Sequence, residues 1–441
     1  MSTNSLVSDA PDTLPTSPPL QPPPHALYTP WQRYGFLAVL FLVSTSNYFD
    51  YYILSVVLEP IKREFQVSDT LLGLLSGFCF ALVYAFAGFP IARWADRGNR
   101  RLIIAVALAG WSVITMSCAL ARNFWQLALA RFGLGVVEPG ALPPSQSLIA
   151  DYFPPERRAT ALAVLTTASA AGYLFGVAMG GYIAASYGWR AAFLWAGAPG
   201  LLLALVARLT LAEPRLQLGF PAAREHPEKA PETALRLCRK RSYLFALIGL
   251  SVYCVFAFGE NIFLPSLMIR TLHATLKQVS VLWGISISLA SVVGAVGGGW
   301  LADRLHSRDV RWYAWLPAVA CALAMPLYWA AFASTHLRSF ILLDFLAEAV
   351  VTAGVPVAYA AMHAVCGSQR RAVAIAAAQF ALTLLGAGFG PLLVGLLSDA
   401  FGARYGAESL RYSLITLTLF LVPAAAAFYY SSHALPRDLE D

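Results

Sequence analysis

Residues 92–101, ARWADRGNRR, and residues 299–308, GWLADRLHSR, carry the same short pattern about 207 positions apart. A second pair follows, because PPERRATALA at 154–163 matches GSQRRAVAIA at 367–376 with an offset of about 213. Two different motifs that repeat at nearly the same offset indicate that the chain contains two copies of one unit. Each motif also stands beside an apolar stretch of about 20 residues, the length that spans a bilayer as a helix.

The composition of the chain is that of a membrane protein. Of the 441 residues, 58% are hydrophobic and only 12% are charged, whereas roughly a quarter of the residues of a soluble domain are charged. Apolar runs recur along almost the whole chain without the alternation of a membrane β-barrel, so the predicted fold is an all-α membrane protein. Twelve transmembrane helices are expected, at 33–59, 69–94, 101–121, 124–152, 157–186, 190–213, 241–272, 276–304, 311–334, 338–366, 370–402 and 410–432.

The longest polar interruption divides these helices into two pseudo-symmetric six-helix halves. The predicted organisation is a disordered Pro-rich tail (1–30), a first half (31–213), a linker (214–240), a second half (241–432) and a short tail (433–441). Lys and Arg concentrate on one side of this arrangement, which places both termini in the cytoplasm by the positive-inside rule. The net charge of +7 then reflects topology rather than nucleic-acid binding, and we expect a multi-pass protein of the inner membrane.

Carboxylates occur at matching positions inside the apolar spans of the two halves. An offset of 210 residues relates Asp50 to Glu260, and the same offset relates Glu138 to Glu348. Because lipid does not solvate charged groups, such residues face the bundle interior or a wet cavity. We expect the four to converge on one central cavity and to bind protons, since burial and neighbouring like charges favour protonation near neutral pH. The alternative is a relic of duplication in which only structural pairing remains.

Further polar residues lie beside these carboxylates. Arg131 precedes Glu138 by seven residues and shares its helix face, so it neutralises Glu138, forms a structural salt bridge or binds an anionic substrate group; all three roles stay open. Asp344 and Glu348 share a helix face, and we expect one of them to be protonated or paired. The aromatic stretch around Asp50 is a candidate lining of a ligand cavity. The predicted substrate contacts are Arg131, Asn47, Tyr48, Tyr51, Asn261 and Asp344.

The motifs of several other protein classes do not occur in this sequence. It contains no phosphate-binding P-loop, no nucleophile elbow and no HExxH zinc motif. We therefore expect neither ATP-driven transport nor an enzyme, and no cofactor or metal is predicted. The fifth predicted span carries Gly172, Gly176 and Gly180 at four-residue spacing, which permits close packing of helices.

The repeated motifs resemble the loop signature of the major facilitator superfamily, Gly-x-x-x-Asp-Arg, which the second copy keeps at Gly299 and the first changes to Ala92. More specifically, NYFDYY, ARFGLGVVEPG, SLIADYFPPERRATA and GGYIAASYGWRAAF resemble the bacterial branch of spinster-type transporters. The resemblance implies twelve helices, alternating access and proton coupling through Asp50 and Glu138. It also implies a gating latch between the loops. The predicted latch residues are Asp96, Arg97, Arg101, Asp303 and Arg304.

Two departures from that family pattern stand beside the candidate site. Tyr51 replaces an arginine that usually follows the aspartate of the first span, which removes the expected charge partner of Asp50. Pro139 follows Glu138 where the family usually has Gly-Glu-Ala, and a proline there is expected to kink the fourth span.

The predicted function is secondary active transport of an organic solute, driven by protons, with Glu260 and Glu348 as repeat mates of the primary proton carriers. The solute is a lysolipid-like or sphingoid-like lipid or, alternatively, a small organic anion. Five buried carboxylates against Arg131 disfavour a polyanion. The competing class is a non-transporting sensor or receptor with the same fold. Expected partners are the substrate, protons and membrane lipids, with no nucleic acid, and the protein is expected to be a monomer.

Overall fold

The computed structural model describes residues 23–218, 235–366, 374 and 376–439. Every regular element in these residues is a helix, and ten helical stretches are long and apolar enough to cross a membrane. The predicted disordered tail falls mostly on residues 1–22 and the predicted linker mostly on residues 219–234, both outside the described residues.

Two features reconcile these ten stretches with the twelve predicted helices. The predicted helix at 124–152 is broken into α5 (Phe124–Val137), a 3₁₀ turn η3 (Glu138–Gly140) and α6 (Leu142–Tyr152). The last apolar stretch, Ala376–Asp438, is 63 residues long and contains both of the last two predicted helices. The all-α fold with two halves of six helices is therefore confirmed.

The remaining α-helices of the first half are α1 (Pro30–Phe65), α2 (Asp69–Gly73), α3 (Cys79–Arg97), α4 (Arg100–Cys118), α7 (Pro155–Thr166), α8 (Ala168–Leu174), α9 (Gly180–Tyr187), α10 (Trp189–Thr210) and α11 (Pro214–Leu218). Those of the second half are α13 (Arg241–Thr271), α14 (Leu276–Gln278), α15 (Gly284–His306), α16 (Trp312–Ala333), α17 (Leu337–Thr352), α18 (Val355–Ala364), α20 (Gly390–Tyr405), α21 (Ser409–Thr418) and α22 (Leu421–Asp438). The short 3₁₀ helix η1 (Pro24–Leu27) precedes α1, and a second one, η7 (Gly406–Glu408), lies between α20 and α21.

Four π-helical segments repeat the internal symmetry of the sequence in the backbone itself. They are η2 (Leu74–Phe78), η4 (Phe175–Met179), η5 (Val279–Trp283) and η6 (Leu382–Phe389). An offset of about 205 residues relates η2 to η5, and one of about 207 relates η4 to η6. Single π-helical turns are rare and occur mostly at functional positions, so their matched placement shows that both halves use the same backbone plan.

Helix α1 carries the first buried carboxylate, and local sequence defines both of its ends. Thr29 and Gln32 form a capping box at its start, which satisfies two backbone donors that the first turn leaves unpaired. It ends where Gln66 adopts a left-handed conformation with φ 52°, and Ser68 then caps α2. At 36 residues, or roughly 54 Å, α1 is longer than the hydrocarbon core of a bilayer.

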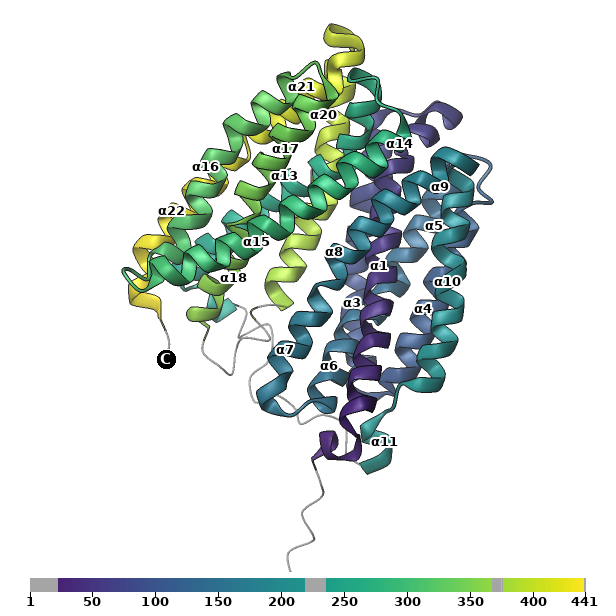
Figure 1. The fold of residues 1–441 in the computed structure, drawn as a ribbon, viewed down its shortest axis with the longest axis vertical. Helices are drawn as coiled ribbons and strands as arrows, with labels where there is room; N and C mark the ends of the chain where they lie inside the picture. Colours follow the sequence, from purple (N-terminus) through teal and green to yellow (C-terminus); the bar gives the residue numbers. More distant parts are fainter. Residues whose placement is uncertain (1–22, 219–234, 367–373, 375, 440–441) are drawn as a thin grey trace, which may run out of the picture.

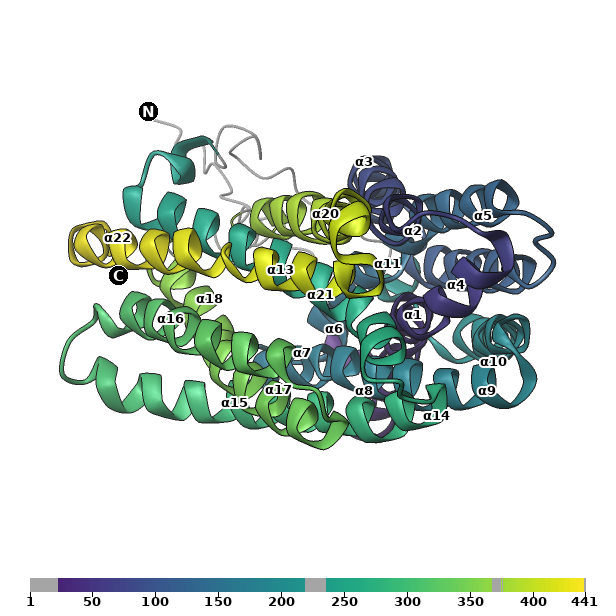
Figure 2. The same cartoon turned by 90° about the horizontal axis from the view of Figure 1, so that it is seen from above.

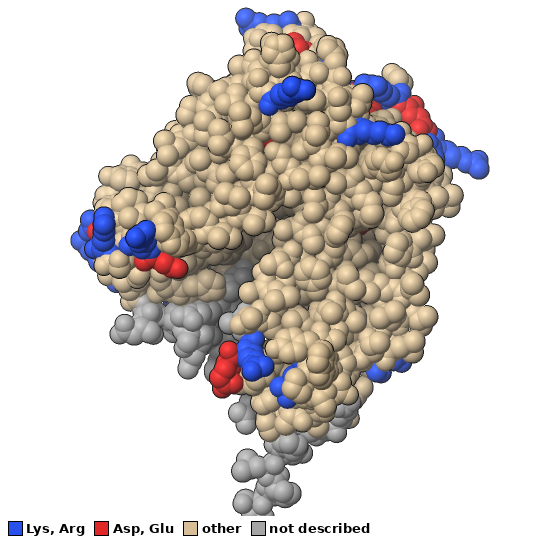
Figure 3. All heavy atoms as spheres, in the orientation of Figure 1, with Lys and Arg blue, Asp and Glu red and all other residues tan. Residues whose placement is uncertain are grey.

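The two halves lie side by side and meet mainly at one end (Figures 1 and 2). Helix α1 begins and α22 ends at the other end, which we call the terminus end (Figure 1). At the opposite end, the closed end, α2 packs against α20, and α9 packs against α14 across the two halves. Figure 3 shows a recess between the halves that widens toward the terminus end. Among the described residues, the two halves are therefore in contact at the closed end and separate toward the terminus end.

Glycines allow the backbones of the two halves to approach closely at the closed end. A Cβ at Gly77 would lie 2.7 Å from the backbone oxygen of Ala387, and one at Gly73 would collide with the backbone of Pro391. In the same way, Gly172 and Gly176 of the fifth span pack on α1, where a Cβ at Gly176 would lie 2.9 Å from the oxygen of Phe49. The predicted packing role of the span-five glycines is confirmed.

Candidate functional site

The first-half site is built around Asp50, which lies buried in the middle of α1. The hydroxyl of Thr115 on α4 donates to its Oδ1 over 2.8 Å. Arg131 of α5 approaches its Oδ2 at 3.4 Å through Nη1. Since Arg131 is the charge partner of Asp50, the loss of an arginine at Tyr51 does not leave this aspartate without one.

Arg131 uses only some of its hydrogen-bond donors in this position. Its guanidinium lies over the ring of Phe193 at 5.0 Å, a geometry in which the ring face attracts the cation. Its Nε and Nη2 have no hydrogen-bond partner among the described residues. An arginine presents five N–H donors, so this side chain has unused donors for a second acceptor.

Glu138 is a candidate second acceptor for the N–H donors of Arg131, because it lies beside the same arginine. It forms the C-cap of α5 at the start of the Glu138–Gly140 turn, so the α-helix is interrupted by a 3₁₀ turn at the position where Pro139 was expected to kink it. Gly140 makes the turn compact, because a Cβ there would lie 2.6 Å from the Cβ of Ala107 on α4. Asp50 and Arg131 are the charged neighbours of Glu138.

The second-half site contains Glu260 of α13 with Asp344 and Glu348 of α17, all three buried. Glu348 accepts from the Ser291 hydroxyl at 2.8 Å and from the Tyr328 hydroxyl at 3.0 Å. Asp344 Oδ2 accepts from the indole Nε1 of Trp283 at 2.9 Å. Among the described residues, no Lys, Arg or His forms an ion pair with any of the three carboxylates.

The described contacts group the carboxylates by half. Of the predicted substrate residues, Arg131 belongs to the first group and Asp344 to the second, and Asn261 lies in a chain of hydrogen bonds between the halves. Tyr173 of α8 donates to Asn261 Oδ1 at 2.8 Å, and Asn261 Nδ2 donates to Glu260 Oε2 at 3.1 Å. This chain of bonds joins the first half to the second. Tyr51 packs on the rings of Tyr52, Phe80 and Phe258.

Several polar atoms of α1 near this junction are buried and have no partner among the described residues: Ser44 Oγ, Thr45 Oγ1, Asn47 Nδ2 and Tyr51 Oη. Tyr48, which is partly buried, stands on the same helix. Since buried polar groups normally have partners, these atoms are candidates for contact with water or a ligand.

Sequence reasoning missed a cluster at the closed end, the closed-end lock. Arg270 of α13 binds Asp69 of α2 through both terminal nitrogens, at 2.7 and 2.8 Å, and Glu59 of α1 through Nε at 2.7 Å. Lys62 adds a 2.6 Å contact to Asp69. Because Arg270 belongs to the second half and its partners to the first, the lock ties the halves together.

Helix α20 completes the closed-end lock from the second half. Ser398 donates to Asp69 Oδ2 at 2.7 Å, and Asp399 accepts from the backbone N–H groups of Asp69 and Thr70 at 3.0 and 2.8 Å. A carboxylate from one half thereby caps a helix of the other half and complements its dipole. The sequence offered one signal for the closed-end lock: its charged residues lie at the ends of predicted spans, on the same predicted side of the membrane.

The predicted latch residues lie at the terminus end. The side chains of Asp96 and Arg97 are outside the part of the chain that the structure describes. Asp303 and Arg304 are exposed, and Arg304 lies over the ring of Trp300 at 5.0 Å. Arg101 approaches the backbone oxygen of Leu211 at 3.4 Å. None of these described contacts joins the two halves.

The neighbouring Arg100, which the sequence analysis did not select, is fully buried and organises the terminus end of the first half. Its guanidinium binds Glu213 and, at 2.6 Å, Asp151, and its backbone N–H donates to Glu213 at 2.7 Å. Beside it, burial and then the charge of Glu213 raise the pKa of Tyr28 to about 12. The group ties α4 to α6 and to the end of α10.

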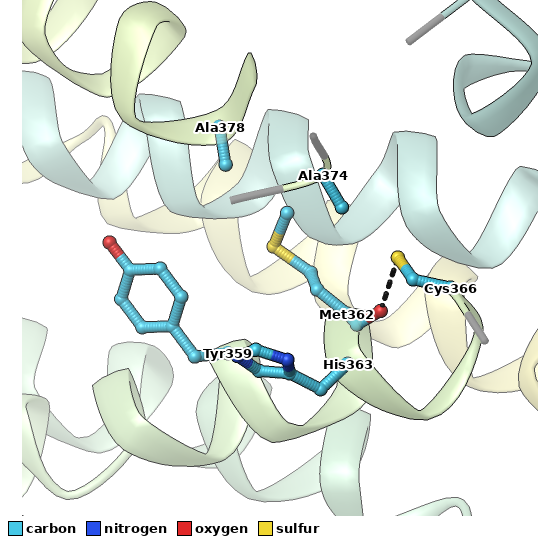
Figure 4. A pocket seen from close by; sticks show the side chains of 6 residues that line it. All are labelled: Tyr359, Met362, His363, Cys366, Ala374 and Ala378. Atoms are coloured by element: carbon cyan, nitrogen blue, oxygen red, sulfur yellow. Dashed lines mark hydrogen bonds between the residues drawn. The ribbon is translucent and has the colours of Figure 1, made fainter. Parts of the chain in front are cut away.

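A small cavity lies beside the terminus end of α18 and is lined by Tyr359, Met362, His363, Cys366, Ala374 and Ala378 (Figure 4). Cys366 Sγ donates to the backbone oxygen of Met362 at 2.8 Å. The volume of about 10 Å³ is close to the minimum for a single water molecule. This cavity is too small to hold an organic solute.

Comparison with known proteins places this geometry in a family. The family model described as "Major Facilitator Superfamily" matches residues 40–331. The chain is 32% identical over 408 residues to an "MFS-type efflux pump" of Mycolicibacterium smegmatis, covering 92% of this chain and 94% of that protein. It is 25% identical to "Protein spinster homolog 1" of Xenopus laevis, over 91% of this chain and 80% of that one.

A solved structure gives a matching result. A bacterial homologue of the human lysosomal transporter spinster, in an inward-facing and unoccupied conformation, superimposes with a TM-score of 0.85 at 29% identity. The match covers 94% of this chain and 100% of that chain.

Proposed function

The chain belongs to the Major Facilitator Superfamily, whose members here include transporters of organic solutes, and we propose that it moves such a solute across the inner membrane by proton-coupled alternating access. The terminus end faces the cytoplasm in this proposal. The positive-inside charge pattern supports that orientation. The similarity to a structure described as inward-facing supports the reading of the recess as the inward-open path.

The observation that carries the proposal is that Arg131, which contacts Asp50, is also an electrostatic neighbour of a second buried carboxyl group, Glu138. One arginine neutralises one carboxylate, so the other carboxyl is uncharged only while it holds a proton. In the described state Arg131 contacts Asp50 at 3.4 Å and keeps two nitrogens unpaired. When the proton passes from Glu138 to Asp50, Asp50 releases Arg131, which then pairs with the Glu138 carboxylate. Proton movement and side-chain movement are linked in this exchange.

The closed-end lock and the recess supply the two alternating states. The described state buries the Arg270 contacts and opens the terminus end. The second state requires the lock to separate, so that its charges become hydrated, while the latch residues Asp96, Arg97, Arg101, Asp303 and Arg304 come together. The solute then binds between the halves, beside Asn47, Tyr48 and Tyr51 and near the repeat mates Glu260 and Glu348. A lipid-like solute and a small organic anion both remain candidates at this stage.

The test measures the two states directly and needs no known substrate. Arg157→Cys on α7 and Ser307→Cys after α15, both exposed, carry spin labels in a background without the six native cysteines. Their separation is measured by pulsed electron spin resonance in nanodiscs at pH 5.5 and pH 8.5. We expect two populations of distances whose ratio changes with pH.

Two variants give this test its control. Glu138→Gln removes one titratable partner of Arg131 and is expected to abolish the pH response while the protein stays folded. Glu156→Gln, an exposed carboxylate on α7, is expected to leave the response unchanged. A single, pH-independent distance in the unmutated protein would reject proton-coupled alternating access and favour a static sensor.

A further inference from the structure

The three carboxylates of the second half form the least compensated group of charges in the described part of the molecule. Helix α17, which carries Asp344 and Glu348, packs against α15 and α16, and α13 brings in Glu260. Glu260 and Asp344 are each 1% exposed. Glu260 interacts electrostatically with both of the others. Three buried like charges in one group are unfavourable unless protons or a cation neutralise them.

Two oxygens of this group have no hydrogen-bond partner among the described residues. They are Glu260 Oε1 and Asp344 Oδ1, whereas Asp344 Oδ2 and both oxygens of Glu348 are bonded to Trp283, Ser291 and Tyr328. A buried acceptor without a donor loses its hydration and gains nothing in return. The two free oxygens therefore indicate a donor that is not part of the chain.

The chemistry of that donor is limited by its surroundings. No group of three His, Cys, Asp or Glu side chains in the described residues is placed to hold a metal ion. The rings of Tyr173 and Trp283 lie 6.3 Å apart beside the group, and Tyr328 reaches it from α16. Aromatic rings attract organic cations, and an ammonium group offers up to three N–H donors.

We propose that Glu260 and Asp344 bind the ammonium group of an organic amine and that this amine is the solute which the protein transports. The inference rests on the proposed transport function and specifies its substrate class. The two unpartnered oxygens accept from two ammonium N–H groups. The ammonium balances one negative charge, and protons on the other carboxyl groups balance the rest. The apolar part of the amine lies against Tyr173 and Trp283. Protons neutralise the carboxylates when no amine is bound.

The bonds between the halves explain how an amine reaches a site that is buried in the described state. Tyr173 and Asn261 connect Glu260 to the first half through contacts of 2.8 and 3.1 Å. Separation of the halves at the closed end breaks the Tyr173 contact and uncovers Glu260. The amine therefore enters in the state opposite to the described one.

The experiment compares ligands that differ only in charge. Purified protein in nanodiscs is titrated at pH 7.5 with ω-phenylalkyl amines of increasing chain length, and with alcohols and carboxylates of the same carbon skeletons. We expect the best amine to bind at least tenfold more tightly than its alcohol, because the charged donors match two charged acceptors. The carboxylate series is expected to bind more weakly than the alcohols.

Two variants then test whether the amine binds at the proposed carboxylates. Glu260→Gln and Asp344→Asn are each expected to reduce the affinity for the amine at least tenfold and to leave the alcohol unaffected. Glu156→Gln serves as the matched exposed control. Monodisperse elution and an unchanged melting temperature without ligand identify folded variants, and Asp344→Asn carries the test if Glu260→Gln does not fold.

The outcomes of the ligand titrations can be distinguished from those of the spin-label test of transport. An amine that binds no better than its alcohol overturns the inference, as does an amine preference that survives in the Glu260→Gln, Asp344→Asn double variant. Because these titrations measure equilibrium binding without a gradient, they report on the acidic site even if the spin-label distances reject alternating access. Conversely, a pH-dependent conformational change without amine binding leaves the transport proposal standing and removes only the substrate class.

Discussion

The two halves share a backbone plan but differ in how they neutralise their buried carboxylates. The offset of 210 that relates Asp50 to Glu260 places Ile341 at the position of Arg131 and Leu134 at the position of Asp344. The first half therefore holds two carboxylates and one arginine, and the second half holds three carboxylates and no arginine in the equivalent group. Duplication has kept the positions of the helices while the chemistry of the two sites has diverged.

The backbone around the second carboxylate diverges as well. In the first half Glu138 stands at the break between α5 and α6. In the second half Glu348 lies within the continuous part of α17, which ends only at Thr352, and α18 begins at Val355. Both carboxyl groups are buried, so the difference lies in the backbone that carries them. In the proposed transport cycle, the first half exchanges the proton and the second half holds the ligand.

The largest effect is expected from removing the arginine that distinguishes the halves. Arg131→Met leaves Asp50 buried without its charge partner and is expected to lower the free energy of unfolding by about 3 kcal/mol. Ile341→Met is the matched change at the equivalent position of the second half and is expected to cost less than about 1 kcal/mol, because it conserves apolar volume. Thermal melting of the purified proteins in detergent measures both.

Equal destabilisation by the two substitutions would show that the Asp50–Arg131 contact contributes little. A combined Asp50→Asn, Arg131→Met variant provides the internal check. We expect it to be more stable than Arg131→Met alone, since it leaves no uncompensated charge.

The second expected effect concerns the proton response. In the spin-label assay, Glu138→Gln is expected to remove the pH-dependent change in distances, whereas Glu348→Gln is expected to keep more than half of it. The reason is that Glu138 competes for Arg131, while Glu348 has its oxygens occupied by Ser291 and Tyr328. If Glu348→Gln reduced the pH-dependent change in distances more than Glu138→Gln, the main proton site would lie in the second half and not in the first.

Features that repeat along the chain were predictable from the sequence. The paired loop motifs and the offset that relates Asp50 to Glu260 predict the two halves, and Pro139 predicts the break that presents Glu138. These features are local or periodic, because helix formation and helix breaking depend on neighbouring residues. Burial of all five carboxylates also follows from their apolar context.

Contacts between distant helices were not predictable in the same way. The spacing of Arg131 and Glu138 suggested a pair within one helix, yet the described contact of Arg131 is with Asp50 on another helix. The closed-end lock joins Arg270 to Asp69 across the two halves, and no local pattern encodes such a pair. Which of two nearby carboxylates an arginine contacts depends on differences of a few ångströms in helix packing, which a single sequence does not specify.

The third expected effect concerns Ile341, which stands where the first half has Arg131. It tests whether the proposed cation binding depends on the absence of an arginine at this position. Ile341 lies three residues before Asp344 and seven before Glu348, so it shares their helix face. Ile341→Arg supplies an internal cation and is expected to weaken binding of the phenylalkyl amine about tenfold without removing a carboxylate. Ile341→Met is the control and is expected to bind the amine normally. Undiminished amine binding in a folded Ile341→Arg variant would separate the amine site from the acidic group.

The fourth effect concerns the contact between the halves. Arg270 binds Asp69 and Glu59 with a side chain that is 13% exposed. Arg270→Met removes the cation that the second half supplies to Asp69 and Glu59, which then keep only Lys62 and Arg63 of their own half. This loss weakens the described state only, because these carboxylates become hydrated when the closed end opens. We expect the ratio of the two spin-label populations to shift about tenfold toward the state closed at the terminus end. An unchanged ratio would show that glycine-mediated packing, rather than the ion pairs, holds the closed end together.

The smallest effect on the ratio of the two spin-label populations is expected from removing Lys62. It contacts Asp69 at 2.6 Å, a shorter distance than the Arg270 contacts, but its side chain is 28% exposed and it belongs to the same half as Asp69. A contact within one half persists in both states, so its removal changes their energies equally and moves no population. Lys62→Met is therefore expected to shift the ratio by less than about twofold. A shift as large as that of Arg270→Met would show that the total charge around Asp69 governs closure. It would then not matter whether a contact lies within one half or between the halves.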